Sequence, residues 1–281
     1  MPKESLLTFG NSSSDFLKLL AVAESKVGKT TYLAAACLGA LPHQTRGLVD
    51  KPENLHILGF DEGFVDGLLN FLRGSCKKGD EFCRISVRPL AEIARKSGAT
   101  SDWDYTLNNA VTAEIMAIKA DIAKGGVHAV IVSSLTGLAS GLQNGLAGPP
   151  NPAKKGGGMD QSKWQDLSRQ INATRNLLQS DTHHTIWEGH VMKGGGADEK
   201  ETMHVTGSAG KSFGFNVEQV VRLRREMTKY PGTTVDKVFM DTRPSLDFVA
   251  GGRGFNEALQ PKEYDLVEFA EKLGKKVGGF K

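Results

Sequence analysis

One segment, Ala23–Thr30 (AESKVGKT), constrains what the chain can fold into more than any other part of the sequence. It matches the pattern G-x-x-x-x-G-K-[ST], except that Ala23 stands at the first glycine. The apolar run Leu17–Ala23 leads into the segment, and the run Thr31–Leu41, rich in Ala and Leu, follows it. The pattern therefore predicts strand, loop and helix, with the loop amides and the amino terminus of the helix converging on a polyphosphate.

Each residue type in this segment has a chemical reason for its position. Gly28 lets the backbone approach a phosphate closely, Lys29 reaches the β and γ phosphates as a point charge, and the Thr30 hydroxyl ligates Mg²⁺. We expect the cofactors ATP and Mg²⁺, with the nucleotide contacted by Glu24, Ser25, Lys26, Val27, Gly28, Lys29, Thr30 and Thr31. Two alternatives stay open, a chance match to the pattern and a loop that has lost nucleotide binding. Ala23 adds a methyl group where the turn is tight, which can alter affinity without abolishing binding.

Apolar runs alternate with helical patterns along the 281 residues, whose composition, 39% hydrophobic and 24% charged, is typical of a globular protein with a sizeable core. Further strands are expected at His56–Phe60, Ile85–Val87, Val127–Val132, Thr185–Val191 and Val217–Leu223, and helices at Leu107–Lys124 and Ser162–Gln179. This alternation predicts an α/β fold in one domain over 1–281, a mainly parallel central sheet with helices on both faces. Shorter β-like runs after residue 200, such as Val235–Met240, predict an antiparallel extension near the carboxyl terminus.

The end of the chain and two glycine-rich segments complete the expected organisation. Leu266, Phe269 and Leu273 follow helical spacing, which predicts an amphipathic helix over about 262–276. The segments 141–160 and 193–202 fit no element, and we expect long mobile loops there. Loops of this length inside a compact domain are usually functional or disordered.

Charge and cysteine content exclude several classes of protein. The formal net charge is +3, from 35 Lys and Arg against 32 Asp and Glu, which is too small to indicate nucleic-acid or membrane binding by itself. The three cysteines have no C-x-x-C spacing, so neither a disulfide scaffold nor a cysteine-based zinc site is expected. The longest nearly apolar stretch, Tyr32–Leu41, is about half of the roughly 20 residues needed to cross a bilayer. We expect a cytoplasmic protein with no membrane partner.

A phosphate-binding loop of this kind needs acidic groups beside it to orient the metal and activate water. Asp61 and Glu62 directly follow the run His56–Phe60, which puts two carboxylates at the carboxyl end of a strand, where open α/β sheets bind ligands. The pair can also simply initiate a helix, because acids are common in first turns. In the run Val130–Thr136 (VIVSSLT), Ser133 stands where a Walker B aspartate is expected. Either water links Ser133 to Mg²⁺, or Asp61 takes over part of the role, or hydrolysis is slow.

The order of these motifs resembles the RecA-like P-loop ATPase core, in particular the RecA-like single-strand annealing ATPases of bacteriophages. The resemblance implies a Mg-dependent ATPase for phage-type DNA recombination or single-strand annealing, encoded by a phage and acting in the cytoplasm of the bacterial host. It gives Glu62 the role of catalytic base, with Asp61 as the alternative. The metal ligands that it implies are Thr30, Ser133 and Asp61.

His190 is a further catalytic candidate. The run Thr185–Lys193 (TIWEGHVMK) is similar to the RecA-like strand that ends in a residue sensing the γ phosphate, and His190 stands at that end. A neutral imidazole can hydrogen-bond the γ phosphate or the attacking water. A structural histidine at a strand end is the alternative. We expect no metal site built from His183, His184, His190 and His204, because no Cys or carboxylate spacing supports one.

The resemblance also implies partners for two segments. RecA-like recombinases place DNA-binding loops after the Walker B strand and after the sensor strand, where this chain has the segments 141–160 and 193–202. Lys154, Lys155 and Lys193 are therefore predicted to bind single-stranded DNA. Loops with no ligand are the alternative, since such compositions are common in linkers. A single-strand-binding protein is a further expected partner.

Another segment, Gly207–Ser212 (GSAGKS), is similar to the one that presents a lysine to the nucleotide of a neighbouring RecA subunit. Lys211 is therefore predicted to be a catalytic cation acting in trans within a homo-oligomer. Two other functions stay open. One is a nucleotide-gated DNA-binding scaffold with little hydrolysis, which Ser133 favours. The other is a P-loop kinase for a small molecule, in which Arg253 would serve the lid.

Overall fold

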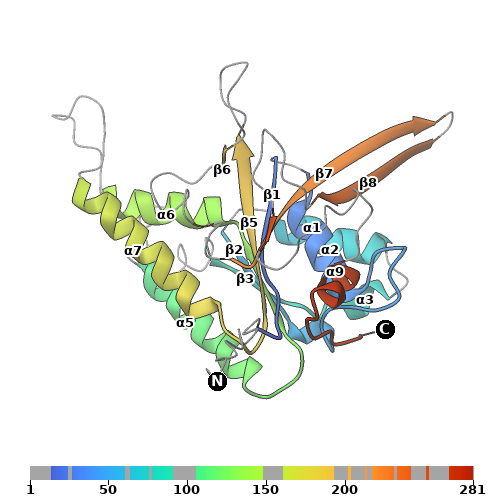
Figure 1. Cartoon of the computed structure of the whole chain (residues 1–281), viewed down its shortest axis with the longest axis horizontal. Helices are drawn as coiled ribbons and strands as arrows, with labels where there is room; N and C mark the ends of the chain where they lie inside the picture. The colour runs from blue at the N-terminus through green and yellow to red at the C-terminus, as the bar shows by residue number, and fades with distance from the viewer. Residues whose placement is uncertain are drawn as a thin grey trace, which may run out of the picture.

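A sheet of nine described strands separates two layers of helices (Figure 1). The computed structural model describes residues 14–24, 27–60, 64–75, 78–90, 106–147, 161–192, 202–203, 213, 217–230, 233–241, 251–252 and 266–280. The strands are β1 (Lys18–Ala23), β2 (Leu55–Gly59), β3 (Ser86–Pro89), β4 (Ala129–Ser133), β5 (His184–Met192), β6 (Thr202–Met203), β7 (Gln219–Tyr230), β8 (Thr233–Asp241) and β9 (Gly251–Gly252). The sheet runs in the order β3-β2-β4-β5-β1-β7-β8, with β6 beside β5 and β9 beside β7.

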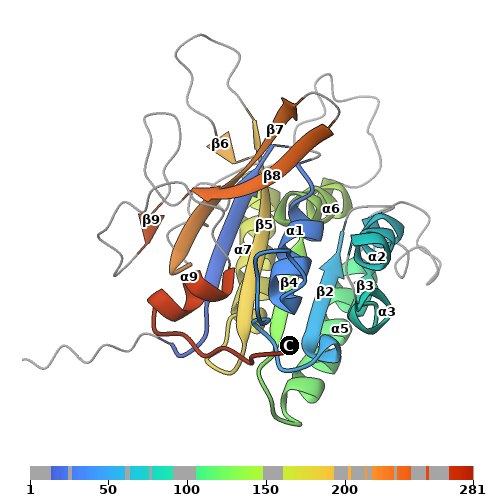
Figure 2. The same cartoon turned by 90° about the vertical axis from the view of Figure 1, so that its right-hand side faces the viewer.

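Helices cover both faces of this sheet (Figures 1 and 2). They are α1 (Lys29–Leu38), η1 (Pro52–Asn54), α2 (Phe64–Ser75), α3 (Gly79–Phe82), α5 (Thr106–Ile122), α6 (Leu135–Ala147), α7 (Gln161–Leu178) and α9 (Leu266–Lys272). One apolar cluster joins one face of the sheet to α1, α2 and α9, and a second joins the other face to α5, α6 and α7. Two cores therefore hold the central strands from opposite sides.

The central strands form because their sequences are apolar on both faces. The strands β2 and β4 are buried along their whole length, as is β1 after its first residue. Successive residues serve opposite cores, so that Leu19 packs with α1 while Leu20 packs with Trp187 in the other cluster. Continuous burial of this kind is typical of parallel strands covered by helices on both sides.

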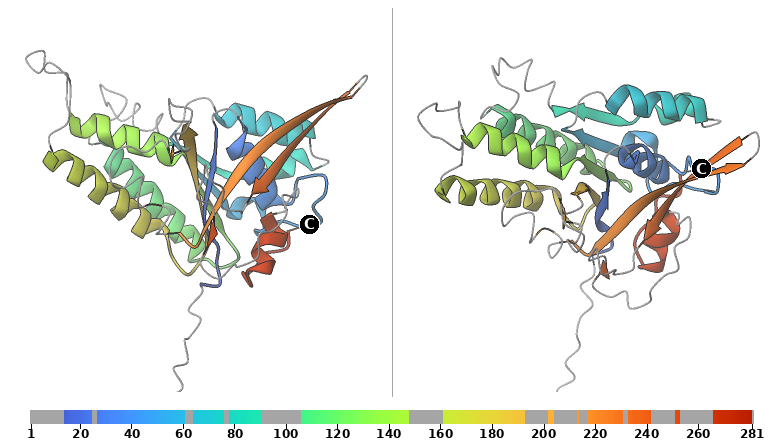
Figure 3. Two further views of the ribbon diagram at one scale, coloured as in Figure 1. Left: turned by 45° about the horizontal axis from the view of Figure 1, so that its top comes forward. Right: turned by 90° about the horizontal axis from the view of Figure 1, so that it is seen from above.

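The predicted fold class is confirmed. The central pairs β2–β3, β2–β4, β4–β5, β1–β5 and β1–β7 are parallel. The pairs β7–β8 and β7–β9 are antiparallel, which is the predicted extension near the carboxyl terminus. Figures 1 and 3 show that β7 and β8 form a ribbon reaching beyond the helical layers.

The predicted loop over 141–160 is wrong at its beginning, because residues 141–147 belong to α6. Leu135, Leu138 and Leu142 are buried in the second cluster at helical spacing. Glycines inside a helix cost about 1 kcal/mol each relative to alanine, and burial of this apolar stripe outweighs that cost. Residues 148–160, with Lys154 and Lys155, lie outside the described part of the chain.

Two other predicted boundaries are wrong. Thr202 is not in a loop, because it pairs with Met192 in the antiparallel contact of β6 with β5. The carboxyl-terminal helix does not reach 276 but ends at Lys272. Gly274 adopts a left-handed conformation (φ 68°), and the Lys275 amide then donates to the Ala270 carbonyl at 2.9 Å, which closes the helix.

Candidate phosphate-binding site

The loop between β1 and α1 has the backbone that a phosphate-binding loop requires. Gly28 has φ 81° and ψ 31°, a left-handed conformation that disfavours any side chain. Its carbonyl accepts from the Tyr32 amide at 2.9 Å, so α1 begins directly after it. Gly28 has no side chain to cap the helix, and the first turn of α1 carries no acid. The amino terminus of α1 therefore has the arrangement that favours binding of an anion.

Lys29 reaches back over this loop. Its Nζ donates to the Glu24 carbonyl at 3.0 Å and lies 3.1 Å from Nδ1 of His190. Because an ammonium can only donate, Nδ1 of His190 is the acceptor and the proton of that ring is on Nε2. Lys29 is 5% exposed. Its cation is therefore buried beside the positive end of a helix, where an anion would be stabilised.

Thr30 joins α1 to the end of β4 and to the middle of β5. Its Oγ1 donates to Oε2 of Glu188 at 2.8 Å and lies 2.8 Å from Oγ of Ser133. A threonine hydroxyl has one proton, so Ser133 must be the donor in the second contact. The three oxygens come from α1, β4 and β5 and meet at one point.

Strand register explains why these side chains meet. Val132 pairs with Trp187 across β4 and β5, so Ser133 and Glu188 are the next residues along two adjacent parallel strands. Ala23 pairs with His190 across β1 and β5, and side chains alternate along a strand, so Glu188 and His190 share a face. Ile186, two residues earlier, packs in the cluster that contains α1. The polar groups thus lie on the α1 side, at the carboxyl ends of the strands.

The end of β5 is fixed by a further contact. The His190 amide donates to Oγ1 of Thr136, in the first turn of α6, at 3.2 Å. The backbone of His190 is therefore tied to α6, while its imidazole contacts Lys29.

The predicted acids follow a well-defined backbone contact. The amide of Phe60, the residue after β2, donates to the Ser133 carbonyl at 2.5 Å. Asp61 and Glu62 come next in the sequence but lie outside the described residues. Their roles stay predictions.

The structure brings Lys29, Thr30, Ser133 and His190 together, and it includes Glu24 through its carbonyl. Val27 packs against the first apolar cluster, and Thr31 lies in the first turn of α1. The remaining predicted site residues lie outside the described part of the chain: Ser25, Lys26, Asp61, Glu62, Lys154, Lys155, Lys193 and Lys211.

Glu188 is the site residue that the sequence reasoning missed. It is 1% exposed, on a strand whose neighbours are apolar. Two signals were available, a charge inside a strand expected to be buried on both faces and a spacing of two residues from His190. The contact with Thr30 itself depends on β5 lying beside β4, which no local pattern reveals.

The donor set at this point fits Mg²⁺. Two hydroxyls and a carboxylate are hard oxygen ligands, and Mg²⁺ is commonly held by one or two carboxylates together with substrate phosphates. Within the described ranges there is no group of three or more His, Cys, Asp or Glu side chains that could hold a metal ion by themselves. The phosphates of a nucleotide would have to supply the remaining ligands.

No protein-family model matches the chain, and no curated protein matches it either. Among solved structures, the chain is similar to a prototypical ATPase from the type III secretion system of pathogenic bacteria, at 13% identity and a TM-score of 0.44. The alignment covers 74% of this chain and 51% of that chain, so this chain spans about half the length of that ATPase. Activity does not transfer across a likeness of this degree. No helix in the described ranges is both long enough and apolar enough to cross a membrane.

Proposed function

We propose that the chain binds ATP with Mg²⁺ at the β1–α1 loop and hydrolyses it. This proposal rests on the position of Lys29 and Thr30 in the first turn of α1, whose amino terminus has no side-chain cap. Thr30 also donates a hydrogen bond to a buried carboxylate. Amides and a lysine suit the phosphates, while the hydroxyls and the carboxylate suit a hard divalent cation. When bound, Mg²⁺ would neutralise charge on the β and γ phosphates.

Lys29 and His190 have complementary tasks in this proposal. The ammonium, held by the Glu24 carbonyl, would exchange part of its contacts for phosphate oxygens. The ring proton on Nε2 of His190 faces away from Lys29 and would donate to the γ phosphate or to the attacking water. Both groups are preorganised by contacts within the chain, so little ordering would accompany binding.

Glu62 is our choice for the base that activates water, with Asp61 as the alternative. Support comes from the contact of the Phe60 amide with the Ser133 carbonyl, which ties the end of β2 to the end of β4. The two acids follow Phe60 directly in the sequence. Replacing each in turn with its amide, Asp61→Asn and Glu62→Gln, would tell them apart, because loss of the base lowers kcat while nucleotide affinity persists.

Lys211 remains our candidate for a cation supplied in trans within a homo-oligomer. Phe213, two residues later in the sequence, packs edge-on against Trp187 with ring centroids 5.0 Å apart. Both rings belong to the apolar cluster on the α5, α6 and α7 side of the sheet, so the chain contacts β5 shortly after Lys211, on the face opposite α1. Mixing a Lys211→Ala variant with Lys29→Ala protein tests the idea, because active mixed sites would form only if the two residues act from different subunits.

Single-stranded DNA is the proposed partner, and recombination or annealing the proposed process. Both rest on the resemblance and on the order of the segments, as does an accessory single-strand-binding protein. Neutralising phosphates with lysines makes binding salt-dependent, with a slope of about 0.7 per contact for single strands. Replacing Lys154, Lys155 and Lys193 with Ala is expected to lower that slope by about 2, and an unchanged slope would remove these lysines from the interface.

The function is tested by ATP turnover of the purified protein with Mg²⁺, with and without single-stranded DNA, using Lys29→Ala as the blank. Turnover that DNA stimulates and that the variant lacks would support a DNA-dependent ATPase. Nucleotide binding without turnover under either condition would favour the nucleotide-gated scaffold, for which Ser133 in place of the expected acid is the specific observation. Absence of nucleotide binding would overturn the proposal.

A further inference from the structure

We propose that the carboxylate that orients the metal has moved from β4 to β5, so that Glu188 performs the task that Ser133, lacking a charge, cannot. This inference rests on the proposed function and names a residue that determines how the site holds Mg²⁺. It also removes the need for Asp61 to replace the missing acid, which leaves the pair Asp61 and Glu62 for the activation of water.

Glu188 is a buried acid on a strand that is covered on both faces. The residue is 1% exposed and stands between Trp187 and Gly189 on a strand that is parallel-paired on both sides. Its partner across β1 is Ala21, and Ile186 precedes it on the same face. Burying a carboxylate is costly even when it is hydrogen-bonded, and an apolar residue would serve the stability of such a strand better. A functional constraint explains the acid more simply.

Counting protons at Thr30 shows what the carboxylate does. The single hydroxyl proton of Thr30 goes to Oε2 of Glu188, and Ser133 donates its own proton to Thr30 Oγ1. One lone pair of Thr30 Oγ1 then remains for a metal ion. Glu188 thus fixes the orientation of the hydroxyl and brings the negative charge that a divalent cation requires.

The two strands make the exchange of the acid geometrically simple. Ser133 and Glu188 follow the paired residues Val132 and Trp187, and each lies 2.8 Å from the same Thr30 oxygen. A carboxylate on either strand can therefore serve that hydroxyl. Carboxylates on both strands would repel one another at this distance, which explains why an acid on β5 is accompanied by a neutral residue on β4.

The experiment compares the dependence of nucleotide affinity on Mg²⁺ in three proteins: wild type, Glu188→Gln and the double variant Ser133→Asp/Glu188→Gln. A fluorescent ATP analogue is titrated at a series of Mg²⁺ concentrations, and Mn²⁺ binding in the presence of the analogue is followed by electron paramagnetic resonance. Gln keeps a hydrogen-bond acceptor for Thr30 and removes the charge. We expect Glu188→Gln to weaken metal binding about 10- to 100-fold and the double variant to recover most of it.

A matched control removes an acid that is partly buried and lies away from the site. Glu218 pairs with Lys275 at 2.7 Å, at the amino ends of the strands. Glu218→Gln should therefore lower the unfolding temperature and leave the Mg²⁺ dependence unchanged. Unfolding temperatures without nucleotide show whether each variant is folded.

The outcomes separate the two proposals. If Glu188→Gln is folded and its Mg²⁺ dependence equals that of the wild type, the inference is wrong. If that dependence is lost but the double variant does not recover it, Glu188 acts through more than its charge and the transfer between strands is wrong. A wild-type protein that binds the analogue neither with nor without Mg²⁺ would overturn the proposed function itself.

Discussion

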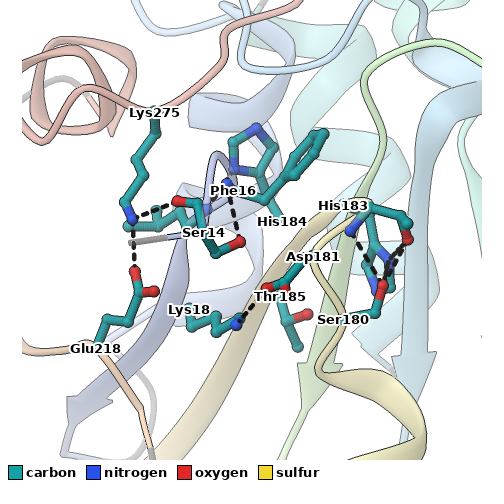
Figure 4. A network of polar contacts seen from close by, with 12 residues as sticks. Ser14, Phe16, Lys18, Ser180, Asp181, His183, His184, Thr185, Glu218 and Lys275 are labelled. Atoms are coloured by element: carbon teal, nitrogen blue, oxygen red, sulfur yellow. Dashed lines mark hydrogen bonds and ion pairs between the residues drawn. The ribbon is translucent and has the colours of Figure 1, made fainter. Parts of the chain in front are cut away.

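The two ends of β5 carry buried polar groups that are organised in opposite ways. Toward the carboxyl end, Thr30, Ser133 and Glu188 converge from three elements on one point, and Lys29 contacts the Glu24 carbonyl and His190. At the amino end, polar side chains form separate links between distant segments (Figure 4). His184, at the amino end, and His190, near the carboxyl end, are about 20 Å apart, because the chain rises about 3.3 Å per residue over six steps.

At the amino end of β5, hydrogen bonds and an ion pair connect segments that are distant in the sequence. The Leu17 amide donates to Nδ1 of His184 at 2.9 Å, which joins β1 to β5. Lys275 Nζ donates to the Ser14 carbonyl at 2.6 Å and pairs with Glu218 at 2.7 Å (Figure 4). These contacts connect the carboxyl-terminal segment with β1 and the start of β7, and they match opposite charges. The buried polar groups at the amino ends of the strands stabilise the fold, whereas those at the carboxyl ends form the candidate site for a charged ligand.

The largest expected effect on stability belongs to the amino end. Lys275→Ala would leave Glu218 without its cation and remove the donor to the Ser14 carbonyl. Breaking a buried pair by removing one partner costs about 3 to 5 kcal/mol, and the lower value applies here because the Glu218 side chain is 22% exposed. Denaturant unfolding measures the loss. ATP affinity, measured below the unfolding transition, should not change, and a parallel loss of affinity would contradict the separation of the two ends.

The second largest expected effect is a loss of folding stability at low pH, through the buried His184 at the amino end of β5. Burial lowers the pKa of His184 from 6.5 to about 3, so the unfolded chain binds a proton that the folded chain excludes as the pH falls below about 6.5. Stability is therefore complete above that pH and declines below it, by about 3 kcal/mol at pH 4 through this residue alone. Burial also lowers the pKa values of His56 and His183 to about 4, which adds to the same slope.

His184→Gln checks this expectation by denaturant unfolding between pH 7 and pH 4. The variant loses part of its stability at every pH because Gln cannot reproduce the packing of the ring, but its stability should fall less steeply with acid than that of the wild type. An unchanged slope would show that His184 does not titrate as its burial implies.

A smaller effect is expected at two glycines that both have a positive φ. Gly28 and Gly125 have φ values of 81° and 93°, and a β carbon at either would meet no atom within 4 Å. Alanine at either position should cost about 1 to 2 kcal/mol through backbone conformation alone. Gly28→Ala should also weaken ATP binding, whereas Gly125→Ala should not, because Gly125 lies between α5 and β4 away from the loop. Equal ATP affinities in the two variants would count against the role of Gly28.

The sequence was sufficient for the elements and for part of the site. Long apolar runs predicted the central strands, because strands covered on both faces need them, and the segment Ala23–Thr30 predicted the strand, loop and helix that the structure contains. The resemblance pointed to Ser133 and His190, which lie beside Thr30 and Lys29, and their roles stay predictions. All of these features can be read from a few consecutive residues of the sequence.

The parts that escaped depend on tertiary contacts. The contact of Glu188 with Thr30 requires β5 to lie between β1 and β4, which is a property of strand order. The residues 141–147 look like a loop by their glycines, and they become helical because Leu142 is buried and Leu146 partly buried in the cluster that joins α6 to the sheet. The link from Lys275 to Ser14 joins the two ends of the described chain, and no local pattern announces it.

The most direct test of the central claim is isothermal titration of ATP with Mg²⁺ into the wild type, Lys29→Ala and Lys18→Ala. Lys18 is the first residue of β1 and Lys29 the first residue of α1, but Lys18 pairs with Asp181 at the amino end, at 2.7 Å, on the surface. We predict that Lys29→Ala loses measurable ATP binding while remaining folded, and that Lys18→Ala binds as the wild type does. Undiminished affinity in folded Lys29→Ala protein would contradict the assignment of the β1–α1 loop as the nucleotide site.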